Sequence, residues 1–287
     1  MSAVSLKIAL NAIRNHVFIV FVVFALMILN WGLEVIKWRY FTLRIQYVSL
    51  KQAVNSILLG IVAGIFTPNR VGELGGRLLY ISKKNRSNAI YINSLCSIAQ
   101  LTATLLFGLV ALYLIKDIQP YFEVSDHFAE FSIAFAISFT LIIFFKGNIL
   151  RRLIVMFNNQ FNKESSAIPV QFSIVDRFKI LLISSLRYLV FCVQFALLLL
   201  IFTPDLNIVD GFVSASLIFL LTTVIPSGWV SDLPIRTSFA FIVLALFGYD
   251  GAYGSIASIV LWSVNLFIPA TLGLLVVRKV KWKNSRN

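Results

Sequence analysis

Charged residues are scarce in this chain. They make up 13% of the 287 residues, whereas a soluble domain carries about 25%. Hydrophobic residues make up 59%, and the mean hydropathy is +0.88. The composition excludes an ordinary soluble domain and predicts an all-α polytopic membrane protein. Long strands of alternating polarity, which would indicate an outer-membrane barrel, are also lacking.

Acidic residues are the scarcer charges, since 12 acids stand against 25 lysines and arginines and leave a net charge of +13. In a soluble protein such an excess would suggest a nucleic-acid partner. Here the basic residues concentrate in short loops and in the C-terminal tail, which is the positive-inside pattern. We therefore expect membrane lipids as partners and no nucleic acid.

The chain has little that would support catalysis. Cys96 and Cys192 lie in separate apolar runs, so we expect reduced core residues and neither a disulfide framework nor a metal site. The two histidines have no companion acid motif, and nucleophile-elbow, HExxH and P-loop motifs are absent. We expect no enzyme, no cofactor and no metal. An intramembrane lipid-modifying enzyme that uses Glu73 and Asp232 is the weakest alternative.

Five apolar runs are long enough to cross a bilayer, which takes about 20 residues. They cover about 17–37, 88–115, 128–146, 178–202 and 254–277. The first resembles a signal peptide, but no small-residue cleavage site follows, so we expect an uncleaved span. The longest polar stretch is only linker-sized. We therefore expect a single transmembrane domain over 1–287, with a cytoplasmic linker at about 147–177.

Two further apolar runs, 53–66 and 211–225, are too short to span. Each ends near a proline, which breaks a helix, and a second short apolar piece follows each break. Runs of 10–14 apolar residues are more often re-entrant segments than spans. We expect two re-entrant hairpins, at about 53–82 and 211–248.

Loop charges predict the sides of the membrane. Loops 37–51, 83–86 and 146–179 and the tail are rich in lysine and arginine and should be cytoplasmic, whereas loops 117–130 and 204–210 lean acidic. These assignments agree only if the first hairpin opens to the cytoplasm and the second to the outside. The C-terminus is then cytoplasmic. The same count places the N-terminus outside, whereas the basic residues there favour the cytoplasm, so the N-terminal orientation is left open.

The two hairpins look like an inverted pair. IFTPNRVGELGGR (65–77) and VIPSGWVSDLPIR (224–236) each place a proline and a small or polar turn before an acid, with an arginine four residues later. The acids are Glu73 and Asp232, and the arginines are Arg77 and Arg236. Inverted repeats with discontinuous helices that meet near the midplane are a common transporter plan. The sequence thus predicts an inverted pseudo-repeat.

These residues suit a lipid headgroup. A helix that begins at membrane depth presents free N–H groups and a positive dipole end to an anion. Arg70, Arg77 and Arg236 can grip phosphate bidentately, while Glu73 and Asp232 neutralise them or contact an amine. The headgroup would be anionic or zwitterionic. The alternative is that the charges are interfacial loop residues paired to hold the turn.

Other residues allow two readings. Arg187 either snorkels to the cytoplasmic interface or contacts a headgroup, and Trp229 either packs or lines the site. Glu34 stands one turn before Lys37 and Trp38, which favours an interfacial ion pair over a proton site. Trp262 reads as a belt or packing residue.

The run TPNRVGE, preceded by a glycine-containing apolar run and followed by an arginine, resembles the lysylphosphatidylglycerol synthase transmembrane (flippase-like) family. IPSGWVSDLPIR and EVIKWRYF (34–41) resemble further signatures of that family, and the resemblance covers nearly the whole chain. Where relatives often have Arg-Glu in the late motif, Arg236 is followed by Thr237. The resemblance implies that the site includes Pro68, Arg70, Gly72, Glu73, Arg77 and, less directly, Arg236; Asn69 joins them as part of the same break.

The resemblance implies a protein of a bacterial or archaeal cell membrane that moves lipids or lipid-linked glycans between leaflets. The aminoacyl-transfer domain of bifunctional members is not in this sequence, so synthesis of a lysyl lipid is not implied. We expect a translocase that passes headgroups through a polar cleft between the two hairpins, by equilibration or with an ion gradient. The alternative is a lipid-binding scaffold with a glycosyltransferase partner. A homo-oligomer is also open.

Overall fold

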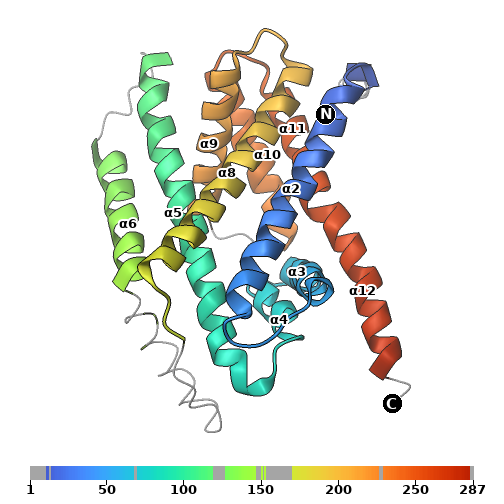
Figure 1. Ribbon diagram of the computed structural model, residues 1–287. Helices are drawn as coiled ribbons and strands as arrows, with labels where there is room; N and C mark the ends of the chain where they lie inside the picture. Colours follow the sequence, from blue (N-terminus) through green and yellow to red (C-terminus); the bar gives the residue numbers. More distant parts are fainter. Residues whose placement is uncertain are drawn as a thin grey trace. The chain divides into compact units, whose positions relative to one another are not determined.

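Figure 1 shows the protein as a computed structural model. The structure describes residues 11–12, 14–67, 70–118, 127–146, 150, 152, 170–225 and 229–284. Within these ranges the regular elements are all helical, with no strand. The all-α prediction is therefore confirmed.

Among the described residues, four helical segments are long and apolar enough to cross a membrane. They are α2 (Val17–Thr42), α5 (Arg86–Ile118), α8 (Ile174–Phe202) and the segment that joins α11 (Gly251–Trp262) through η3 (Ser263–Phe267) to α12 (Ile268–Asn284). They coincide with four of the five predicted spans. The fifth, 128–146, lies in α6 (His127–Lys146), whose described side chains form a shorter apolar segment.

Large apolar side chains are exposed along these helices, as a hydrocarbon environment would favour. In α2, Phe18, Phe21 and Ile28 are each about two thirds exposed or more. Cys96 and Cys192 are free and buried, as the sequence predicts. These observations are those of a membrane-embedded, multi-pass protein.

The chain divides into two compact units, which are described here separately. Unit 1 comprises 1–30, 104–134 and 188–267, and unit 2 comprises 31–103, 135–187 and 268–287. Most of the predicted linker at 147–177 lies outside the described residues, and α8 begins inside its range at Ile174. A single transmembrane domain stays a prediction.

In unit 2, a break separates α3 (Leu50–Ile65) from α4 (Gly72–Leu78). Ser49 and Gln52 form a capping box that fixes the start of α3. The two helices pack side by side, and α12 also packs against α3 (Figure 1). Glycine permits this approach, because a Cβ atom at Gly72 or Gly76 would overlap the backbone of α3. The break predicted after Phe66 is confirmed.

In unit 1, α9 (Ile208–Val224) and α10 (Trp229–Leu246) flank the second break. Gly248 follows α10 with φ +81°, a left-handed conformation that glycine adopts without strain. Asp250 then caps α11 by accepting a hydrogen bond from the Ala252 amide. Together α9 and α10 begin and end within about three residues of the predicted range 211–248.

Candidate functional site

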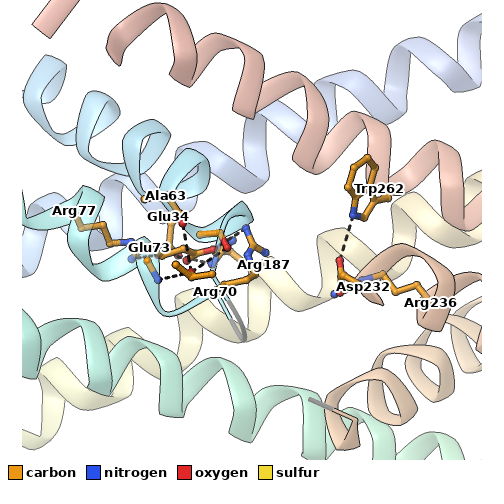
Figure 2. Close-up of polar contacts among 12 residues, drawn as sticks. Glu34, Ala63, Arg70, Glu73, Arg77, Arg187, Asp232, Arg236 and Trp262 are labelled. Carbon is orange, nitrogen blue, oxygen red and sulfur yellow. Dashed lines mark hydrogen bonds and ion pairs between the residues drawn. The ribbon is translucent and has the colours of Figure 1, made fainter. Parts of the chain in front are cut away.

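Glu34 is the centre of a buried set of charges in unit 2 (Figure 2). It lies in the second half of α2, and its side chain is only 3% exposed. Its carboxylate pairs with Lys37 Nζ at 2.9 Å, with Arg77 Nη1 at 2.7 Å and with Arg187 Nη1. The three cations come from α2, α4 and α8, so one acid joins three helices.

Neighbouring aromatic and polar side chains hold the three cations in place. The Arg77 guanidinium stacks over Trp38 and that of Arg187 over Trp31, each at 5.6 Å from the ring centroid. Such cation–π contacts contribute about 0.5–2 kcal/mol, depending on desolvation. Lys37 also donates a hydrogen bond to Ser184 at 3.2 Å. The cations therefore have defined positions.

A second acid, Glu73, extends the ion pairs toward the surface. Its carboxylate lies 2.7 Å from Arg70 Nη2 and 3.4 Å from Arg77 Nη2. The side-chain exposure falls from 41% at Arg70 through 23% at Glu73 to 8% at Arg77. Positive and negative side chains thus alternate from the accessible Arg70 through Glu73 and Arg77 to the buried carboxylate of Glu34. This alternating series is the charge ladder. The whole set, called the Glu34 cluster below, is Glu34, Lys37, Arg70, Glu73, Arg77 and Arg187.

The break between α3 and α4 positions the outer half of this cluster. Arg70 has φ +56°, a left-handed conformation that is uncommon outside glycine. Thr67 closes the turn, because its hydroxyl accepts a hydrogen bond from the Gly72 amide at 2.7 Å. A Cβ atom at Gly64 would stand 2.6 Å from Glu73 Cγ, so glycine lets the glutamate lie flat against α3.

The charges of the cluster do not balance. Four cations face two carboxylates, which leaves an excess of two positive charges. The other acid that the structure describes in unit 2, Asp176, pairs with Arg44 at 2.7 Å. In addition, the buried Nε atoms of Arg70 and Arg77 have no hydrogen-bond partner among the described residues. Buried charge without compensation is costly, so the arrangement favours binding an anion.

Unit 1 holds a smaller polar group at the start of α10. Asp232 accepts a hydrogen bond from Arg236 Nε at 3.0 Å and another from Trp262 Nε1 at 3.2 Å (Figure 2). The Asp232 and Arg236 side chains are 19% and 32% exposed. This pair is balanced in charge, unlike the Glu34 cluster.

The predicted site residues fall into three groups. Arg70, Gly72, Glu73, Arg77 and Arg187 come together in or beside the Glu34 cluster, whereas Asp232 and Arg236 form the pair in unit 1. Pro68 and Asn69 lie outside the described residues, as does the side chain of Trp229.

Three outcomes differ from the sequence-based reading. The Glu34–Lys37 pair is present, but it is buried and Glu34 is shared with two arginines. The Arg187 side chain pairs with the buried Glu34 and does not extend to an exposed helix end. Trp262, expected only to pack, donates to Asp232. The available signal was an acid, a lysine and a tryptophan within five residues at the end of an apolar run.

The described residues contain no group of three or more histidine, cysteine, aspartate or glutamate side chains that could hold a metal ion. Comparison of the chain with family models, with curated proteins and with solved structures finds no match.

Proposed function

We propose that this protein is a lipid translocase of the flippase-like kind, and that the Glu34 cluster binds the headgroup. The observation that carries the proposal is the excess of two positive charges in a set of ion pairs built around the buried Glu34, in a protein with several helices of membrane-spanning length. Ionisable residues at membrane depth usually mark substrate or ion pathways. A phosphate group supplies the missing negative charge, and arginine forks bind phosphate bidentately.

The graded exposure of the ladder supports transfer as well as binding. Arg70 is accessible and Arg77 is buried, with Glu73 between them. A headgroup can therefore meet a cation at the surface before it reaches the buried ones, without crossing apolar surface as an unpaired charge. Each site along such a path must bind weakly enough to release the headgroup again.

The family resemblance supports the same reading. TPNRVGE contributes Arg70 and Glu73 to the cluster, and EVIKWRYF contributes Glu34 and Lys37. Two of the resembling segments, separated by residues 42–66, thus supply one set of ion pairs. We infer membership of the lysylphosphatidylglycerol synthase transmembrane family from this.

We also propose that α3–α4 is a re-entrant hairpin opening to the cytoplasm and that α9–α10 is one opening to the outside. α3 has 16 residues and α9 has 17, so each rises about 24–26 Å, less than the hydrocarbon thickness of about 30 Å. The C-terminal tail is cytoplasmic in this topology, in a bacterial or archaeal cell membrane. That the two breaks face one another across a cleft stays a prediction.

The proposal is tested by reconstituting the purified protein into vesicles that carry a fluorescent anionic phospholipid. A membrane-impermeant reductant bleaches only the outer leaflet, so transfer appears as bleaching beyond half of the signal. We expect transfer in protein-containing vesicles and none in protein-free vesicles. Lipid binding without transfer would favour the scaffold alternative, and a change in lipid mass would favour an enzyme.

A further inference from the structure

The two carboxylates of the Glu34 cluster differ in how firmly they are held. Glu34 is 3% exposed and contacts three cations. Glu73 is 23% exposed, and its contact with Arg77 is long, at 3.4 Å. Removing a buried carboxylate from its partners is costly, whereas partly exposed ion pairs contribute little to stability. An incoming anion can therefore displace Glu73 far more readily than Glu34.

Glu73 also occupies the place that an anion would take. Its carboxylate bridges the guanidinium groups of Arg70 and Arg77, with one oxygen toward each. Phosphate and carboxylate oxygens use the same arginine N–H donors. The two acceptors cannot both fill this position.

We propose that Glu73 is a built-in competitor of the substrate: the phosphate of the ligand displaces Glu73 from Arg70 and Arg77, while Glu34 keeps Arg77 and Arg187 in place. The inference rests on the proposed anion site and assigns Glu73 a part in release. When the phosphate leaves, the carboxylate returns and restores the ion pairs, so the empty site is never without a counter-ion. The phosphate can belong to a lipid headgroup or be free in solution.

Gly64 provides a second way to test this competition. The nearest atoms to a Cβ at this position belong to the flexible side chains of Glu73 and Arg70, with Glu73 Cγ at 2.6 Å. Gly64→Ala should therefore displace the Glu73 side chain without removing its charge. The change imitates the displacement that the ligand is proposed to cause.

The test is calorimetric titration of the detergent-purified protein with two probes, inorganic phosphate and the short-chain lipid dihexanoylphosphatidylglycerol. Loss of the competing ion pairs should tighten binding roughly fivefold in Glu73→Gln and in Gly64→Ala. Asp250→Asn is the matched control, because it removes one negative charge from an exposed helix cap that asparagine fills equally well. Its affinity should equal that of the wild type.

Tighter binding of either probe supports the proposal, and the probe that responds identifies the source of the phosphate. Unchanged or weaker binding in Glu73→Gln overturns it, as does the absence of binding to both probes. If Glu73→Gln does not fold, Gly64→Ala decides by the same criterion. Leaflet transfer by the wild type without tighter binding in the variants would overturn this inference alone. Tighter binding without any transfer would overturn the proposed function alone.

Discussion

Glu34 and Arg187 are separated by 153 residues in the chain and meet as a buried ion pair in unit 2. Arg77 binds the other oxygen of the same carboxylate, at 2.7 Å. A single acid thus fixes α4 and α8 to α2. Glu34 is therefore a structural residue as well as part of the site. Its replacement should lower stability, whereas replacement of Glu73 should change binding and transfer.

Replacing Glu34 by glutamine should destabilise the protein. The change leaves Lys37, Arg77 and Arg187 buried without their shared acid, and breaking a buried pair in this way costs about 3–5 kcal/mol. Thermal unfolding of the detergent-purified protein should show a clearly lower midpoint than the wild type. Asp250→Asn, which removes the same charge from an exposed position, should leave the midpoint unchanged. Equal midpoints for Glu34→Gln and the control would contradict the central role of Glu34.

Adjacent glycines of α4 should respond in opposite directions to alanine. A Cβ atom at Gly76 would overlap the backbone of Leu59 and Gly60, whereas one at Gly75 meets nothing within 4 Å. Gly76→Ala should destabilise the protein by about 1–3 kcal/mol through overpacking. Gly75→Ala should stabilise it by up to about 1 kcal/mol through helix propensity. Unfolding midpoints in one detergent check both, and a harmless Gly76→Ala would refute the close packing of α3 on α4.

Local charge patterns could be predicted from the sequence, and distant partners could not. The pairs Glu73–Arg77 and Asp232–Arg236 follow from i,i+4 spacing on a helix, and both are present. The pair between Glu34 and Arg77 spans 43 residues and depends on how α4 packs on its neighbours. The periodicity of a sequence does not show how helices pack on one another. The sequence therefore indicated only Lys37 as a partner of Glu34.

Helix positions were predictable where proline, glycine or a polar cap marks the end. α9 ends at Val224, next to the predicted end of the run 211–225, and Gly248 follows α10 at the predicted end of the hairpin 211–248. α4 is shorter than the second half of the predicted hairpin 53–82, because its seven residues end at Leu78. Its short dipole adds little to an anion site, so the arginine side chains supply the positive charge.

Cysteine labelling should reveal the opposed orientation of the two breaks. Val71 and Val224 flank the breaks and are 69% and 71% exposed, and the natural cysteines are buried. In intact cells, an impermeant maleimide should label Val224→Cys, while Val71→Cys should react only after the membrane is opened. Labelling of both from the same side would refute the proposal of two oppositely oriented hairpins.

The most direct test of the account is the leaflet-transfer rate of Arg70→Ala and Glu73→Ala in reconstituted vesicles. Arg70→Ala removes the accessible cation at the exposed end of the charge ladder. Glu73→Ala removes the acid that is proposed to promote release of the phosphate. Arg86→Ala, which removes an exposed arginine at the start of α5, is the control. The account predicts that both site variants fold and insert but lose transfer, while the control keeps the wild-type rate. Wild-type rates in both site variants would contradict it.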